Sequence, residues 1–188
     1  MALLDNTFEE LLKKIRQSDY LNAAKSDPIF YFVYPPEEML ALKQHYTRWT
    51  ARFRDAGLAV VRVSFCDLLW GCVDQSGRWE AWLEDERDYD RSQINHAVTD
   101  VLTGEGHLVQ AIRQEIDAAG PKSVVFLTET EVLHPYFRTR VIESAIHDKI
   151  SVPVVIFYPG YRSGQYGLKF LGFYAEDPNY RSTMIGGL

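Results

Sequence analysis

Two glutamates and a histidine that follow a predicted strand are the first candidates for chemistry in this chain. The strand is Ser123–Leu127, and the side chains behind it are Glu129, Glu131 and His134. Because alternate residues of an extended segment share a face, the two carboxylates could act as an acid–base or metal-binding pair. The histidine stands at a strand-to-helix transition, a frequent place for catalytic side chains. If these side chains act in this way, the protein is a divergent nucleotide- or metal-dependent enzyme centred on these three residues. We keep this as the alternative to the function reached at the end of this section.

The same residues also have a structural interpretation, which their spacing favours. Glu129 can pair with Arg138 or Arg140, and the histidine can pack at the start of the next helix. No further ligand follows at a spacing diagnostic of metal, and Cys66 and Cys72 are too few for a metal knuckle or a disulfide scaffold. We therefore predict no catalytic residues, no metal site and no cofactor, and we expect that the protein is not an enzyme.

The turns that would hold a phosphate lack the residues for that task. The predicted strand Ile29–Tyr34 runs into Pro35–Glu38, which has two prolines and two glutamates where a phosphate-binding loop needs glycines, a lysine and backbone donors. Gly160, Gly164 and Gly167 do follow a strand, but the next predicted element is another strand, so no helix N-terminus is available. These patterns disfavour nucleotide binding.

Tyrosines and arginines gather around the last predicted strands, and these residue types are enriched at protein–protein interfaces. The candidate partner-binding residues are Arg138, Tyr158, Tyr161, Arg162, Tyr180 and Arg181. The competing interpretation is that several of these tyrosines bury their rings in the core. Trp79 and Trp82, within an acidic stretch, form a second candidate patch if they are exposed.

Strands and helices alternate along the chain, which predicts an α/β fold with a mainly parallel central sheet flanked by helices. The order of strands and helices is like that of P-loop or Rossmann-like proteins, but without a Walker A loop. A β-hairpin is predicted at the C-terminal end. The predicted strands are Ile29–Tyr34, Ala59–Phe65, Ser123–Leu127, Val152–Tyr158 (mid-sheet, ended by Pro159-Gly160) and Leu168–Tyr174. The predicted helices are Thr7–Gln17, Pro36–Asp55, one from Asp90 or Ser92 to Leu102, Glu105–Ala119 and Pro135–Asp148.

With 188 residues and 46% hydrophobic content, the chain can form one domain with a substantial core. Residues 1–188 are expected to be a single α/β domain, in which 1–27 form an N-terminal helix and connector. Residues 71–90 replace apolar periodicity with acids, glycine and tryptophan, which predicts an irregular or weakly helical acidic insert.

The net charge of −6 disfavours binding to nucleic acid, because the field of the molecule would repel phosphates. A local basic face in the C-terminal third is still compatible with the sequence. No apolar run approaches the length of a membrane span, and the N-terminal segment lacks a signal-peptide core, so we expect a cytoplasmic protein with no membrane contact.

A series of short motifs, in this order, resembles the BrxB family, a component of BREX bacteriophage-exclusion systems. The motifs are Phe32-Val33-Tyr34-Pro35-Pro36-Glu37, Phe65-Cys66-Asp67-Leu68-Leu69, Leu133-His134-Pro135-Tyr136-Phe137-Arg138, Val155-Ile156-Phe157-Tyr158-Pro159-Gly160, Leu168-Lys169-Phe170-Leu171-Gly172 and Asn179-Tyr180-Arg181. The resemblance implies a bacterial protein in a defence complex that blocks phage replication and accompanies methylation of host DNA. It also implies a protein partner, the alkaline-phosphatase-like component PglZ, and no established activity of its own.

We therefore expect a non-catalytic adaptor that binds a larger BREX component, such as PglZ, through its strand-end loops. The sequence leaves open which component is contacted and whether the chain self-associates.

Overall fold

The computed structural model describes residues 2–17 and 28–187, and its centre is a twisted, mainly parallel sheet. The strands are β1 Ile29–Tyr34, β2 Ala59–Ser64, β3 Ser123–Thr128, β4 Val154–Ser163, β5 Gly167–Phe170 and β6 Thr183–Gly186. Their order is β2-β3-β4-β1-β6, with β5 antiparallel to β4. The predicted fold class is confirmed, and β4 lies mid-sheet between β3 and β1 as expected.

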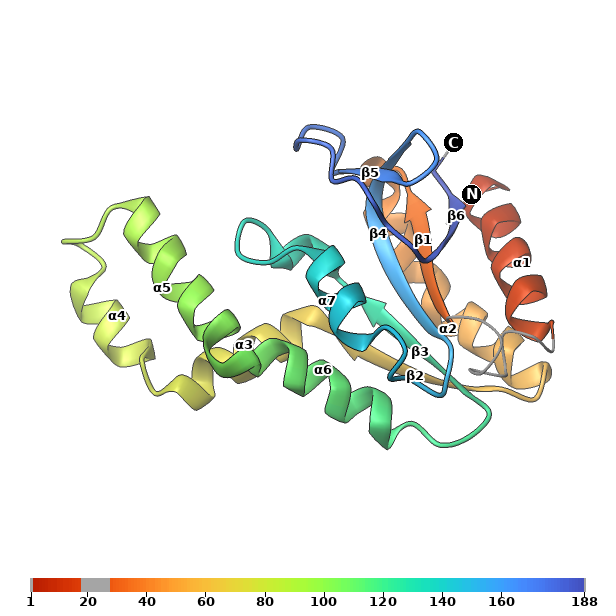
Figure 1. Cartoon of the computed structure of the whole chain (residues 1–188), viewed down its shortest axis with the longest axis horizontal. Helices are drawn as coiled ribbons and strands as arrows, with labels where there is room; N and C mark the ends of the chain where they lie inside the picture. Colours follow the sequence, from red (N-terminus) through yellow and green to blue (C-terminus); the bar gives the residue numbers. More distant parts are fainter. Residues whose placement is uncertain (1, 18–27, 188) are drawn as a thin grey trace.

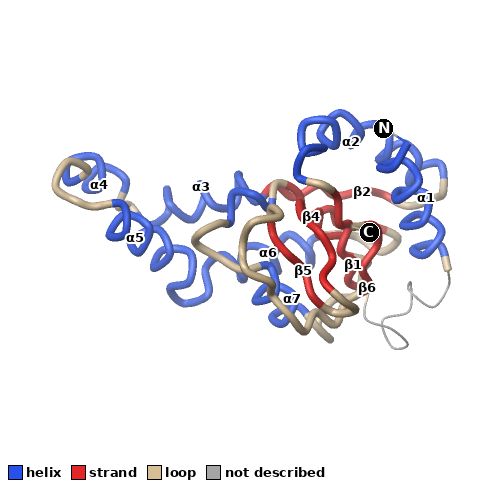
Figure 2. The backbone as a smooth tube through the Cα atoms, turned by 90° about the horizontal axis from the view of Figure 1, so that it is seen from above, coloured by secondary structure: helices blue, strands red, loops and turns tan. Residues whose placement is uncertain are grey.

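Helices cover both faces of this sheet (Figures 1 and 2). They are α1 Ala2–Arg16, α2 Met39–Asp55, α3 Phe65–Ser76, α4 Trp79–Asp85, α5 Arg91–Thr103, α6 His107–Ala118 and α7 Thr139–Ile146. Short 3₁₀ turns span Pro36–Glu38, Gly104–Gly106 and Thr130–Leu133. Side chains of α1 and α2 pack on one face, and those of α3, α5, α6 and α7 pack on the other. None of these helices has both the length and the hydropathy needed to cross a membrane within residues 2–17 and 28–187.

The buried sides of β1 explain its uninterrupted apolar sequence. Ile29 and Tyr31 face the core beneath α3, α6 and α7, whereas Phe30 and Phe32 face the core beneath α1 and α2. Because both faces of the strand are covered, every one of its six residues is buried.

Helices α3, α4 and α5 extend away from the sheet as a helical arm, on the left in Figures 1 and 2. Ser64 begins α3 by accepting a hydrogen bond from the backbone N–H of Asp67 at 3.2 Å, and Gly77 ends it at a φ of 64°. Within 71–90, where the sequence predicts an irregular or weakly helical insert, the structure has the second half of α3 and the short helix α4. Of the two predicted starts of the next helix, Asp90 and Ser92, the structure has Asp90, which caps α5 through a reciprocal capping box with Gln93.

The C-terminal part differs from expectation in where elements begin and end. The hairpin is present, but β4 continues through Pro159-Gly160 to Ser163, and β5 ends at Phe170. The helix predicted from Pro135 begins only at Thr139, after a turn. Strand β6, which pairs with β1 in parallel, was not predicted at all. The predicted connector at 21–27 lies outside the described residues.

Candidate functional site

The two glutamates at the end of β3 meet, but a lysine from α2 lies between them. The Nζ atom of Lys43 is 3.2 Å from Glu129 Oε1 and 3.3 Å from Glu131 Oε1. Ser64 donates a hydrogen bond of 2.5 Å to Glu129, and Arg62 lies 3.9 Å from the same carboxylate. The Ser64 hydrogen bond, followed by the positive charges of Lys43 and Arg62, lowers the pKa of Glu129 below its ordinary value. The pair is therefore neutralised by the chain itself.

The arginines suggested as structural partners for this carboxylate lie elsewhere. Arg140 pairs with Asp177, with its Nε atom 2.9 Å from Oδ1, and neither Arg138 nor Arg140 contacts Glu129 in the part of the chain described. The structural interpretation of the glutamates is supported, but with Lys43 and Arg62 as the partners.

His134 belongs to an aromatic cluster, and the charges that act on it are those of Arg138 and Asp177 rather than those of the two glutamates. Its ring stacks on Phe170 and packs at a tilt against Tyr174, with centroid distances of 4.2 and 4.3 Å. Burial, and then the nearby charge of Arg138, lowers the pKa of His134 to about 4. Across residues 2–17 and 28–187, no three His, Cys, Asp or Glu side chains lie close enough to hold a metal ion. Glu129, Glu131 and His134 therefore do not form a metal-binding group in this part of the chain.

This packing of His134 predicts a pH dependence of stability. The unfolded chain binds a proton on this histidine below about pH 6.5, whereas the folded chain resists it until about pH 4, so stability should fall as the pH drops through that window. The expected loss is about 2 kcal/mol, after allowing for solvent around the half-buried ring. Urea unfolding of wild type and His134→Phe from pH 7 to pH 4 measures it. If the free energy of unfolding falls with pH to the same extent in the two proteins, the prediction is wrong.

The turn after β1, where a phosphate would bind in a nucleotide-binding sheet, is occupied by the chain's own side chains. Glu37 lies in the 3₁₀ turn, and its carboxylate accepts hydrogen bonds of 3.0 and 3.1 Å from the hydroxyl of Tyr161 on β4. The Tyr161 ring is 36% exposed. The turn thus presents a carboxylate bound to the hairpin.

Two of the six predicted partner-binding residues lie in the core. Tyr158 and Tyr180 are each 2% exposed, and both pack edge-on against Tyr31, with ring centroids 5.8 and 5.0 Å away. The Tyr180 hydroxyl lies 3.3 Å from Thr139 Oγ1 and 3.4 Å from Asp177 Oδ2. Neither ring offers an exposed surface in this structure, so burial disfavours direct contact of these two tyrosines with a partner, and both support the surface above them.

The arginines among the six are accessible to a partner. Arg138 and Arg181 are exposed, and the guanidinium of neither forms an ion pair with any described carboxylate. Arg162 is half-buried, and its Nε atom is buried without a hydrogen-bond partner in the described part. Unpaired guanidinium groups can still form bidentate hydrogen bonds with a carboxylate of another protein.

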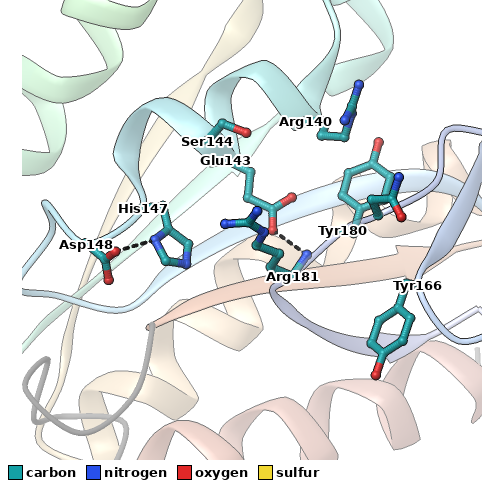
Figure 3. A pocket seen from close by; sticks show the side chains of 9 residues that line it. Arg140, Glu143, Ser144, His147, Asp148, Tyr166, Tyr180 and Arg181 are labelled. Atoms are coloured by element: carbon teal, nitrogen blue, oxygen red, sulfur yellow. Dashed lines mark hydrogen bonds and ion pairs between the residues drawn. The ribbon is translucent and has the colours of Figure 1, made fainter.

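Arg181 lines an open polar pocket of about 980 Å³ between α7 and the segment that leads to β6 (Figure 3). The lining residues are Arg140, Glu143, Ser144, His147, Asp148, Tyr166, Asn179, Tyr180 and Arg181. Of these nine, only Tyr180 and Arg181 are site residues predicted from the sequence. A signal was present, because the polar residues of α7 and its C-terminal end recur at 140, 143, 144 and 147, the spacing of one helical face.

The carboxylate of Glu143, a lining residue of this polar pocket, holds α7 and the segment before β6 together. Glu143 is 3% exposed, and its Oε1 atom accepts hydrogen bonds from the backbone N–H groups of Arg181 and Ser182, at 2.9 and 2.8 Å. The hydroxyl of Ser182 donates a third, at 2.6 Å. Glu143 therefore ties the start of β6 to α7 and sets where the Arg181 side chain emerges.

The fold and this surface define the class: an α/β protein in which side chains of the chain itself pair at the strand-end turns. The polar pocket with its arginines is accessible on its surface. A family model described as BREX protein BrxB matches residues 61–185, so the chain belongs to the BrxB family. A BREX protein BrxB from Bacillus cereus (strain H3081.97) is 21% identical over 190 residues, covering 98% of each chain. No match to a solved structure was found.

Proposed function

We propose that this chain is a non-catalytic adaptor of a BREX phage-defence complex and binds a larger component such as the alkaline-phosphatase-like PglZ. A role in BREX defence follows from membership of the BrxB family. The adaptor role is our inference. It is carried by one observation: the edge of the sheet where α/β proteins bind small ligands is filled with paired side chains.

The exposed arginines supply the contact in this proposal. Arg181 is exposed and lines the polar pocket, and Arg138 and Arg162 supply further guanidinium groups. Arginine is enriched among the residues that dominate binding energy, and the loss of such a residue commonly costs about 2 kcal/mol or more. An acidic surface on the larger component would match them.

Charge reversal of Arg181 is therefore expected to weaken the complex about 30-fold, the factor that corresponds to about 2 kcal/mol. The test is affinity purification of the tagged chain with the products of its neighbouring BREX genes, comparing wild type, Arg181→Glu and the double variant Tyr161→Ala/Arg162→Ala. Arg113→Glu is the matched control, because Arg113 is exposed on α6 away from the polar pocket and makes no ion pair with a described residue.

The same strains measure the biological result, since plating efficiency of a BREX-restricted phage should rise with Arg181→Glu and stay low with Arg113→Glu. Unaltered recovery of the partner from both test variants would remove these residues from the interface.

Calorimetry with ATP, GTP and divalent cations addresses the adaptor role separately. Micromolar binding that is abolished by Glu129→Gln would favour the enzyme alternative and contradict our proposal.

A further inference from the structure

The helical arm carries an apolar groove that no described residue covers. It encloses about 430 Å³ and is lined mainly by aromatic and aliphatic side chains of α3, α4 and α5. Those that remain between 36% and 48% exposed are Trp70, Trp79, Leu83, Tyr89 and Ile94. Large apolar side chains exposed together in this way mark interaction sites on monomeric proteins. The exposure proposed for Trp79 is thus present in the structure, and Trp82 is partly buried beside it.

Helix α4 has too little support from its own chain. It is seven residues long, and none of its residues is buried. A helix this short is unstable in water without packing, because nucleation is costly. Trp82 packs against the core, and Trp79 makes an edge-on contact with Trp70 of α3, with ring centroids 5.4 Å apart. A partner placed in the groove would cover the open side of Trp79 and Leu83 and supply the missing packing.

The charge of the arm restricts what that partner can be. Residues 65–103 contain nine aspartates and glutamates and three arginines, a formal charge of −6, which equals the charge of the whole chain. The remainder of the chain carries seventeen acidic and seventeen basic side chains, so all the excess negative charge is on the arm. Glu86 is itself one of the groove residues. A basic partner is favoured, and acidic surfaces are repelled.

We propose that the groove of the helical arm binds an amphipathic α-helix of a partner protein, with the apolar face of that helix in the groove and lysines or arginines along its edges. A groove between helices with aromatic walls suits this mode of recognition. A second copy of the arm is disfavoured because two surfaces of charge −6 would face each other, and anionic lipid or nucleic acid is disfavoured for the same reason. This contact is separate from the one proposed for Arg181, which favours an acidic partner.

Two synthetic peptides of about 18 residues, roughly five helical turns, test the proposal. Both carry leucines at i, i+3, i+4 and i+7, and they differ only in having lysines or glutamates at the edges of that face. Fluorescence anisotropy of the labelled peptides with the full chain, at about 0.1 M salt, should show at least about tenfold tighter binding of the lysine peptide. Its affinity should fall as salt is raised.

The variant Leu83→Glu separates the apolar contact from charge attraction. It adds a negative charge that would attract the lysine peptide, so the expected loss of affinity, about tenfold or more, must come from the groove. Leu40→Glu is the matched control, since Leu40 is 78% exposed on α2, outside the arm. Circular dichroism of both variants should match wild type because both side chains are exposed.

Each alternative has a distinct outcome. Equal binding of the two peptides, or binding of the lysine peptide that Leu83→Glu leaves unchanged, would overturn the proposal. A wild-type dimer in sedimentation velocity that Leu83→Glu dissociates would show that a second copy occupies the groove. Binding to anionic phosphatidylserine vesicles that the same substitution abolishes would show a membrane surface instead.

Discussion

Replacement of Glu143 by alanine is expected to lower the free energy of unfolding by about 4 kcal/mol. The substitution removes the acceptor for the backbone N–H groups of Arg181 and Ser182 and for the Ser182 hydroxyl. The two Ser182 hydrogen bonds are buried and that of the Arg181 N–H is part-buried, and the backbone of residues 181–182 has no second acceptor among the described hydrogen bonds. A buried donor that loses its partner costs about 1–3 kcal/mol, and several are lost together.

Urea unfolding of Glu143→Ala measures this loss. Glu143→Gln should cost less because its amide oxygen can still accept, and Glu115→Ala is the control for removal of a carboxylate from an exposed helix position. Glu143→Ala should also release Arg181 from its position in the lining of the polar pocket. The affinity for the partner should therefore fall in this variant. Stability within about 1 kcal/mol of wild type would show that Glu143 does not hold this segment.

The structural role of Glu143 could not be found in the sequence, because its partners are distant in the chain. The donors lie 38 and 39 residues beyond it, and nothing in the local pattern of α7 indicates which segment will pack there. The Lys43 contact with Glu129 spans 86 residues and was missed for the same reason. Spacing finds partners within one element, whereas these pairs depend on how elements pack together.

Elements with a strong local signal were predicted closely. Strand β1 was placed at its observed bounds, because a short apolar run between Pro28 and Pro35 has few alternatives. Helix α4 gave no such signal, since none of its residues is buried and a helix without a buried face shows no apolar period of its own. Strand β6 has four residues, only one of them buried, and depends on pairing with a strand about 150 residues earlier.

The tyrosines show why residue type alone could not define the interface. Tyr158 and Tyr161 are three residues apart on one strand, yet the first is buried and the second is partly exposed, because β4 leaves the sheet core between them. Burial raises the pKa of Tyr180 to about 12 and that of Tyr158 further. Only the sheet order reveals that Tyr158 lies beside Tyr31 and belongs to the core.

Pro159-Gly160 was interpreted as the end of a strand, but the structure gives this glycine another role. A Cβ atom added at Gly160 would lie 2.3 Å from the carbonyl oxygen of Lys169 on β5 and 2.9 Å from Cε1 of Tyr158. Backbone approaches this close require glycine, so the residue permits β4 and β5 to pair where the hairpin begins. Proline is accepted next to it because the pairing of β3 with β4 ends at Ile156, so Pro159 has a neighbouring strand, among those described, only on its β1 side.

Gly160→Ala is therefore expected to destabilise the protein by about 3 kcal/mol, since neither the β5 backbone nor the buried Tyr158 ring can move without opening the hairpin. Gly71→Ala is the matched control, because Gly71 lies inside α3 and the added methyl group would meet no atom within 4 Å apart from its chain neighbours and the nearby backbone of its own helix. That change should raise stability by about 0.5–1 kcal/mol through helix propensity. If alanine lowers the free energy of unfolding at Gly160 and raises it at Gly71, the requirement for glycine lies at the β4–β5 contact. If both positions tolerate alanine equally, the hairpin does not require glycine at position 160.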